Sequence, residues 1–268
     1  MPDVHALLIA LGAMVIAAVL TWLLSIAKKD VSIVDSAWSL LFLLGALTYA
    51  ANDGQQTLAT RGILISSLLV VWGSRLCLYI TWRNWGEGED RRYQAIRARN
   101  EPGFAWKSLY LVFTLQAVLA WLIAMPVFAG LTATSALNVV DGFGVTLWLV
   151  GFAFESVGDG QLARFKADPA NHGKVLDVGL WRFTRHPNYF GEATQWWGFY
   201  LLATAAGAWW TVFAPVLMTF MLLKVSGVSL LEKDIGERRP AYRAYIERTS
   251  AFVPWPPTPD APHAGGGA

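Results

Sequence analysis

The chain has 268 residues, of which 55% are hydrophobic and 15% are charged. A soluble domain of this length carries about 25% charged residues, so the composition excludes an ordinary soluble enzyme and favours an integral membrane protein. The formal net charge of +2 is small. Basic loops in such a chain indicate topology and contact with membrane lipids, and no nucleic acid is expected as a partner.

Seven apolar windows predict membrane-spanning helices, because about 20 apolar residues cross the hydrocarbon core of a bilayer. The windows lie near residues 5–27, 32–51, 61–81, 108–130, 140–163, 193–206 and 209–228. The last two are separated by little more than Gly207 and should form a tight helical hairpin. The fold class is therefore all-α, with one polytopic domain over residues 1–252. The Pro- and Gly-rich stretch 253–268 is predicted to be a disordered tail.

The distribution of basic residues predicts the orientation. Lysines and arginines follow the first, third, fifth and seventh windows, whereas only Arg61 lies on the opposite side. Basic loops stay cytoplasmic, which places the N-terminus outside and the C-terminus inside and requires an odd number of spans. We expect the bacterial inner membrane, with the functional site at the cytoplasmic side.

Several kinds of site are excluded by spacing. The four histidines lack metal-ligand spacing, so no metal is expected. No G-x-G-x-x-G follows a strand, which excludes a Rossmann domain. The lone Cys77 excludes an internal disulfide.

The stretch RHPNYFGE is the most informative internal loop. Pro187 fits the first position of a helix, whose free N–H groups and partial positive charge suit a phosphate. Arg182, Arg185 and His186 flank this end. Asn188 and Glu192 are four residues apart, so they share one helix face and can accept from a ribose hydroxyl or an amide.

Polar residues also occur inside the predicted spans, where they normally face a bundle interior or a wet cavity. Glu155 and Asp159 share a face of the fifth span, and Lys166 falls near that face two turns later. Arg75 interrupts the third span and should point inward. Early in the second span, Asp35 and Trp38 form another inward polar point.

The stretches GDGQLARFK, GLWRFTRHPNYFGE and LLEK…RRPAYRAY…TSAFVP resemble the C-terminal domain of steroid 5-alpha-reductases. They are more similar still to the bacterial branch of membrane proteins of unknown function grouped with that domain. The match runs from about Trp72 to Pro254, which makes residues 72–252 the cofactor-binding half. The resemblance implies an enzyme: an NADPH-dependent oxidoreductase that reduces a carbon–carbon double bond conjugated to a ketone in a steroid-like or other lipid.

The resemblance places Arg75 near the cofactor, Asp159 at the family's cofactor-binding Asp, and Asn188 and Glu192 on its N-x-L-G-E motif. Tyr245 and Glu232 would belong to a C-terminal cofactor lid. With the basic loops that neutralise phosphates and the motif tyrosines, the residues expected to bind NADPH are Arg75, Arg83, Arg92, Asp159, Lys166, Arg182, Arg185, His186, Asn188, Tyr189, Glu192, Glu232, Tyr242 and Tyr245.

The sequence departs from the steroid enzymes at the substrate. Their Glu in helix two and Tyr in helix three grip the substrate ketone, but the simplest alignment offers Phe42 and Trp72. With Trp38, these are the expected substrate contacts. Two residues are candidate catalytic groups: Asp35, if burial keeps its carboxyl protonated, and Tyr93, although its loop position also suits cofactor contact.

A second interpretation of these motifs is a methyltransferase. Membrane methyltransferases of the isoprenylcysteine and phospholipid type carry a similar R-x-x-R-H-P-x-Y stretch and bind S-adenosylmethionine. The complete NYFGE, the helix-five stretch and the single Glu232 in place of a Glu-Glu pair favour the reductase. A non-enzymatic lipid-binding or transport role is the third alternative, and the oligomeric state is left open.

Overall fold

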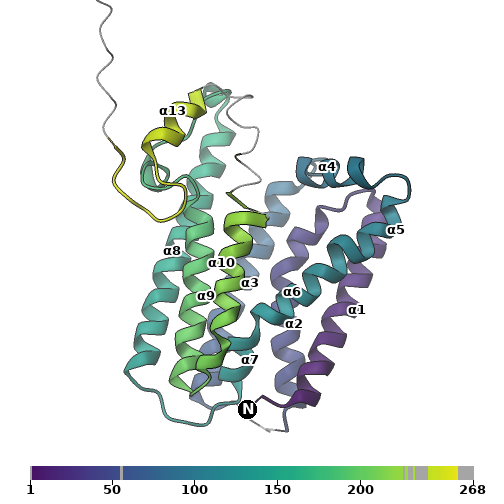
Figure 1. The fold of residues 1–268 in the computed structure, drawn as a ribbon, viewed down its shortest axis with the longest axis vertical. Helices are drawn as coiled ribbons and strands as arrows, with labels where there is room; N and C mark the ends of the chain where they lie inside the picture. Colours follow the sequence, from purple (N-terminus) through teal and green to yellow (C-terminus); the bar gives the residue numbers. More distant parts are fainter. Residues whose placement is uncertain (1, 55–56, 226, 229–231, 233–240, 259–268) are drawn as a thin grey trace, which may run out of the picture. The chain divides into compact units, whose positions relative to one another are not determined.

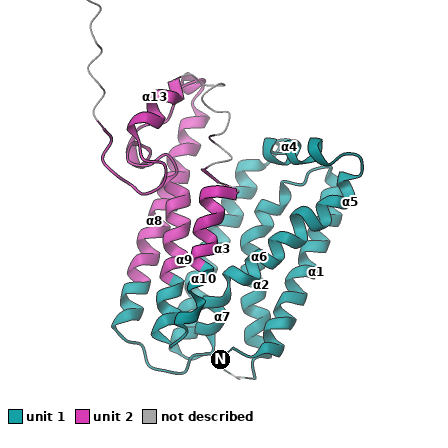
Figure 2. Ribbon diagram, viewed as in Figure 1, with its two compact units in different colours: residues 1–144, 199–214 teal, residues 145–198, 215–268 magenta. Residues whose placement is uncertain are grey.

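A computed structural model describes residues 2–54, 57–225, 227–228, 232 and 241–258. These residues form helices, turns and loops without a strand, so the all-α prediction is confirmed over this part of the chain. The chain divides into two compact units, which Figure 2 distinguishes by colour. Unit 1 comprises residues 1–144 and 199–214, and unit 2 comprises residues 145–198 and 215–268. Residues 259–268 of the predicted tail lie outside the described residues.

Figure 1 labels the helices in chain order. Unit 1 contains α1 (Val4–Lys28), α2 (Ile33–Asn52), α3 (Thr60–Asn84), α4 (Arg91–Asn100), α5 (Phe104–Ser108), the π-helical segment η1 (Leu109–Thr114), α6 (Leu115–Ile123), α7 (Met125–Leu131) and η4 (Trp209–Val212). Unit 2 contains η2 (Pro169–Asn171), η3 (Gly179–Arg182), η5 (Met221–Val225) and α13 (Ala241–Arg248). Three helices contribute residues to both units: α8 (Val139–Ala167), α9 (Pro187–Ala205) and α10 (Phe213–Phe220).

Five helical segments of the described chain are long and apolar enough to cross a membrane: α1, α2, α3, the α5–α6 segment Phe104–Ile123, and α8. Their outer faces are apolar as well, since Leu8, Ile16, Leu47 and Leu78 are each more than half exposed. A helix that is apolar on all sides belongs in lipid. The predicted membrane character is supported by these helices, and the sixth and seventh windows correspond to α9 and the shorter apolar stretch Trp209–Val225.

Helix α1 illustrates how the sequence builds unit 1. The Asp3 carboxylate caps the helix by accepting from the backbone N–H groups of His5 and Ala6 at 2.7 and 3.0 Å. The buried stripe of the helix consists of alanines and a serine with the larger Met14 and Trp22, while several leucines and isoleucines face outward. At Gly45 of α2 an added Cβ would lie 2.7 Å from the Met14 sulfur, so this glycine allows α1 and α2 to approach closely.

Unit 1 also encloses a buried ion pair. Arg61 of α3 is fully buried, and its Nε and Nη2 groups donate to the two Asp141 carboxylate oxygens at 2.8 Å each. The same guanidinium donates to the Ser135 carbonyl and hydroxyl and to the Ala136 carbonyl. Arg61, the only basic residue expected on the side opposite the basic loops, is therefore paired with a carboxylate inside the protein.

In unit 2, glycines set the approach of α8 and α9. A Cβ added at Gly151 would lie 2.5 Å from the Gly191 carbonyl oxygen, and one added at Gly191 would lie 2.4 Å from the Glu155 backbone nitrogen. The absence of a side chain at Gly151 and Gly191 lets the backbones of the two helices come this close. This contact brings the polar faces of α8 and α9 against each other.

The C-terminal segment of unit 2 packs against the loop that precedes α9. The Tyr245 hydroxyl donates to the Trp181 carbonyl, and the Arg185 N–H donates to the Ser250 carbonyl at 2.9 Å. Farther along, the Trp255 N–H donates to the Phe183 carbonyl at 2.9 Å. Residues 241–258 thus fix the loop that leads into α9.

Candidate functional site

The first polar cluster, here termed the α8–α9 seam, consists of Glu155, Asp159, Asn188, Glu192 and Gln195. All but Asn188 are at most 9% exposed. Asn188 Nδ2 donates to Asp159 Oδ1 at 3.1 Å, and Gln195 Nε2 donates to Glu155 Oε2 at 2.6 Å. The structure therefore brings Asp159 and Asn188, both expected at the cofactor, into direct contact.

The seam is rich in hydrogen-bond acceptors. A carboxylate only accepts, so each amide must turn its nitrogen toward its acid, which leaves its oxygen facing elsewhere. Both amide oxygens, Asn188 Oδ1 and Gln195 Oε1, are buried without a hydrogen-bond partner among the described residues. Leaving a buried acceptor unsatisfied costs about 1–3 kcal/mol. These two oxygens could each accept a hydrogen bond from an N–H or O–H group of a ligand.

A second cluster in unit 2 surrounds Glu232. Arg185 donates to both Glu232 oxygens at 2.7 and 2.8 Å and to the Ile246 and Thr249 carbonyls. His186 Nε2 lies 2.9 Å from Glu232 Oε1, and its ring stacks on Tyr189 with centroids 5.5 Å apart. Burial alone would raise the pKa of Glu232, but the hydrogen bonds from His186 and Arg185 and the positive charge of Arg185 hold it at about 2.

This cluster gives Arg185 a role that the sequence did not indicate. Four of the five N–H groups of a guanidinium are occupied by protein acceptors, so at most one remains for a ligand. The remaining cations near the RHP motif are more accessible, since Lys166 and Arg182 are both exposed. Tyr245 is buried, and its neighbour Tyr242, 5.2 Å away between ring centroids, is half-buried.

The second candidate site lies in unit 1 and is termed the Asp35 cluster: Asp35, Arg92, Tyr93 and Gln116. Arg92 Nη2 donates to Asp35 Oδ2 at 2.7 Å, and the Tyr93 hydroxyl donates to Asp35 Oδ1 at 2.6 Å. Gln116 Nε2 donates to the Tyr93 oxygen at 3.3 Å. The two candidate catalytic residues are thus in direct contact. Burial, and then the negative charge of Asp35, raise the pKa of Tyr93 well above its usual value.

Helix α4 holds the Asp35 cluster in place. Its N-cap residue Asp90 accepts from the Arg92 N–H at 2.8 Å and from Arg92 Nε at 3.0 Å. Asp90 therefore orients the arginine toward Asp35, and hydrogen bonds from Arg92 keep the pKa of Asp90 below its usual range despite burial. Arg92, expected at the cofactor, is placed here beside a candidate catalytic residue.

The three expected substrate contacts form an aromatic column in unit 1. Trp38 meets Phe42 edge to face with ring centroids 5.0 Å apart, and Phe42 meets Trp72 in the same way at 5.5 Å. Asp35, Trp38 and Phe42 follow one another at helical spacing along α2. The column is therefore an apolar continuation of the Asp35 cluster.

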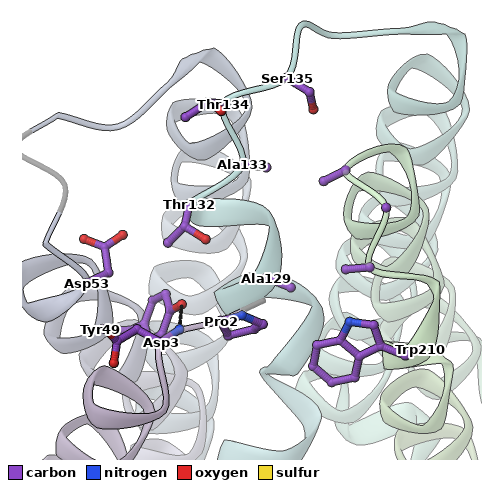
Figure 3. A pocket seen from close by; sticks show the side chains of 13 residues that line it. Pro2, Asp3, Tyr49, Asp53, Ala129, Thr132, Ala133, Thr134, Ser135 and Trp210 are labelled. Atoms are coloured by element: carbon purple, nitrogen blue, oxygen red, sulfur yellow. Dashed lines mark hydrogen bonds between the residues drawn. The ribbon is translucent and has the colours of Figure 1, made fainter.

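A separate polar cavity opens in unit 1 near the start of α1 (Figure 3). Its volume is about 730 Å³, and its lining includes Asp3, Tyr49, Asp53 and Trp210. The Tyr49 hydroxyl accepts from the Asp3 N–H at 3.2 Å. Asp53 follows the last residue of α2, about 27 Å along the helix from Asp35. None of the residues expected at the cofactor or substrate lines this cavity.

Comparison with known proteins identifies the family of this chain. Residues 21–249 match the family described as "Protein of unknown function (DUF1295)". The chain belongs to the DUF1295 family. An uncharacterized protein of Schizosaccharomyces pombe is 26% identical over 262 residues, covering 87% of this chain and 75% of the yeast protein. No solved structure matches the chain.

Not all residues expected at the cofactor of this DUF1295 protein lie in one unit. Arg75 and Arg83 belong to unit 1, where both lie over the Tyr79 ring, at 5.2 and 5.8 Å from its centroid. The seam belongs to unit 2. The convergence of Arg75 with Asp159 and Glu192 stays a prediction.

Sequence reasoning missed Gln116 and Gln195 in this DUF1295 protein. Each is the only amide side chain of a mainly apolar helical stretch, LVFTLQAVLAW and EATQWWGFY. An uncharged polar side chain inside a predicted span was a signal that could have found both. Among the described residues, no group of three or more His, Cys, Asp or Glu side chains is placed to hold a metal ion.

Proposed function

We propose that this protein is a membrane-embedded, NADPH-dependent reductase of a conjugated carbon–carbon double bond in a lipid substrate. The observation that carries the proposal is the pair of buried amide oxygens in the α8–α9 seam, Asn188 Oδ1 and Gln195 Oε1, that lack a hydrogen-bond partner among the described residues. NADPH presents matching donors, namely ribose hydroxyls and the N–H groups of its carboxamide. Asp159, Asn188 and Glu192 would accept from these donors, and the exposed Lys166 and Arg182 would neutralise phosphate.

The Asp35 cluster would serve the substrate. NADPH, when bound, supplies a hydride to the β carbon of an enone, and negative charge then develops on the carbonyl oxygen. A donor aimed at that oxygen is often the largest catalytic contribution. Both oxygens of Asp35 accept hydrogen bonds, so its carboxyl has no proton to give. The Tyr93 O–H can rotate about its C–O bond from Asp35 toward the carbonyl, and Asp35 with Arg92 would position it.

The proposed topology has seven spans, an outside N-terminus and an inside C-terminus in the inner membrane of a bacterium. Exposed tryptophans mark one end of unit 1, with Trp82, Trp85 and Trp106 each at least 65% exposed beside Arg83 and Lys107. Tryptophan with basic residues is typical of the cytoplasmic interface. A reporter enzyme fused after Pro254 should therefore read as cytoplasmic, and a periplasmic readout would contradict both the orientation and the odd number of spans.

The cofactor assignment is tested by binding. Purified protein should bind NADPH, and Glu192→Gln should weaken that affinity about ten- to a hundredfold, because a charge-assisted hydrogen bond contributes about 1.5–3 kcal/mol. The matched control is Glu247→Gln, the same change at an exposed position of α13, which should leave the affinity unchanged. Isothermal titration calorimetry measures both, and equal affinities of the two variants would remove Glu192 from the site.

The acceptors of the α8–α9 seam would also suit a second cofactor, S-adenosylmethionine. S-Adenosylmethionine also carries ribose hydroxyls and an ammonium group, so an acceptor-rich seam admits it. Mass spectrometry of ligand copurified with the protein separates the two cofactors. Binding of S-adenosylmethionine without any dinucleotide would replace the reductase with a membrane methyltransferase.

A further inference from the structure

Gln116 holds an unused hydrogen-bonding atom beside the candidate catalytic pair. Its amide nitrogen donates to the Tyr93 oxygen at 3.3 Å, whereas its carbonyl oxygen, Oε1, is buried without a partner among the described residues. Buried polar atoms in proteins are nearly always hydrogen-bonded, so this atom requires an explanation.

The surrounding hydrogen bonds fix which atom of the amide is left over. Arg92 is always charged and donates to Asp35, so Asp35 is a carboxylate that can only accept. The single proton of the Tyr93 hydroxyl therefore goes to Asp35. The Tyr93 oxygen must then accept from Gln116, which requires the amide nitrogen to face it. The atom without a partner is consequently an acceptor, and what it lacks is a donor.

The helix that carries Gln116 is irregular just before this position. The segment η1 (Leu109–Thr114) is π-helical, and α6 starts at Leu115. A π-helical turn accommodates one extra residue and so turns the following side chains by about 100° around the axis. Such turns are frequent at functional sites. Here the turn directs a lone amide of an apolar span toward Tyr93.

The charge and surroundings of Gln116 restrict the missing donor. Both Asp35 oxygens already accept from Arg92 and Tyr93, so the missing donor meets the uncharged amide oxygen of Gln116, which gives a buried cation no counter-charge. The donor is therefore a neutral O–H or N–H group. The aromatic column of Trp38, Phe42 and Trp72 continues from Asp35 and suits an apolar body.

We infer that the lipid bound at the Asp35 cluster carries a neutral hydrogen-bond donor, a hydroxyl or an amide N–H, which donates to Gln116 Oε1. This inference rests on the proposed function for the location of the substrate but not for the redox chemistry. Gln116 is then a specificity-determining residue: it favours lipids that carry a hydrogen-bond donor beside the group that accepts from Tyr93 and discriminates against lipids that carry only acceptors there.

The test compares three probes with the same chain: 1-hexadecanol, hexadecanamide and hexadecyl methyl ether. Full-length protein in detergent is titrated with each, and apparent Kd values are obtained from the ligand-dependent shift of its unfolding temperature. We expect the alcohol, the amide or both to bind about tenfold more tightly than the ether, because the ether leaves Oε1 unsatisfied. Comparing the alcohol with the amide tells which donor the site prefers.

Substitutions test whether the Gln116 side chain causes the preference for probes with a donor. Gln116→Met preserves length but removes the acceptor, so the three affinities should become equal within about twofold. The control Leu115→Met, an exposed neighbour on the same helix, should retain the wild-type preference. Should Gln116→Met fail to fold, Tyr93→Phe provides a second route, because it frees the amide to turn its nitrogen toward an ether and should reduce the preference below about threefold.

Three results would overturn the inference: equal affinities of the wild type for all probes, no binding of any probe, or an unchanged preference in Gln116→Met. None of these measurements includes a cofactor. Loss of NADPH binding in the separate calorimetric experiment would therefore refute the reductase and leave this result standing.

Discussion

Replacing Arg61 with methionine should lower the free energy of unfolding by about 3–5 kcal/mol, because removing one member of a buried ion pair leaves the other charge uncompensated. Asp141 is 3% exposed, and Arg61 supplies both of its guanidinium contacts. The same substitution also removes the donors to the Ser135 and Ala136 carbonyls. Methionine fills much of the space of the arginine stem, so the lost charge dominates the effect.

Reversible unfolding in mixed micelles with increasing SDS measures this change. The matched control is Arg99→Met, the same substitution at an exposed position of α4, which should alter stability by less than about 0.5 kcal/mol. The double variant Arg61→Met/Asp141→Leu should recover part of the loss, because no buried charge then remains. Equal stability of Arg61→Met and Arg99→Met would show that the ion pair contributes nothing.

Arg61 shows what the distribution of charges along the sequence can predict and what it cannot. Counting basic residues identified it as the exception to the positive-inside distribution. Its burial and its pairing with Asp141 depend on a contact across 80 residues of sequence. Hydropathy windows report the length and polarity of a helix but not the partner of a particular side chain, so the long apolar helices were largely predictable and this ion pair was not.

The seam and the Glu232 cluster differ in the same way. The i, i+4 spacing of Asn188 and Glu192 predicted a shared face, and the cost of acids in a span predicted that Asp159 would point inward. The structure places Asn188 against Asp159 accordingly. Arg185 was expected to contact phosphate, because a local motif gives no sign that its guanidinium is occupied by Glu232, which lies 47 residues later.

Gln116 shows a third limit. Periodicity assumes a regular helix, and the π-helical turn before Gln116 shifts the side chains that follow it. The face on which Gln116 lies could not be obtained from a 3.6-residue period. Gln195 lies in the regular helix α9, where a 3.6-residue period does predict the face of each side chain.

Acidification should release the C-terminal segment of unit 2 before the rest of the protein unfolds. The pKa of Glu232 falls from its ordinary value of 4.5 to about 2 in the folded protein. A lowered carboxyl pKa means that folding favours the charged form. The stabilisation is therefore fully present above about pH 4.5 and is lost as the pH falls toward 2. Protonated Glu232 no longer offers a charged acceptor to Arg185 and His186.

Glu232→Gln should reproduce the acidic state at neutral pH. Arg185 is 6% exposed and would lose its counter-charge, which destabilises the docking of residues 241–258 by roughly 3 kcal/mol. Hydrogen exchange measured by mass spectrometry should show faster exchange in α13, about a hundredfold in this variant at pH 7 and about thirtyfold in the wild type near pH 3, after correction for the intrinsic rate. Glu247→Gln, a change at an exposed position of α13, controls for the loss of a carboxylate in general.

The hydrogen bonds that Tyr245 and Thr184 make between this segment and the loop before α9 do not involve Glu232, so they should persist until Arg185 is released. Exchange in α13 that stays slow in Glu232→Gln would mean that those bonds alone hold the segment.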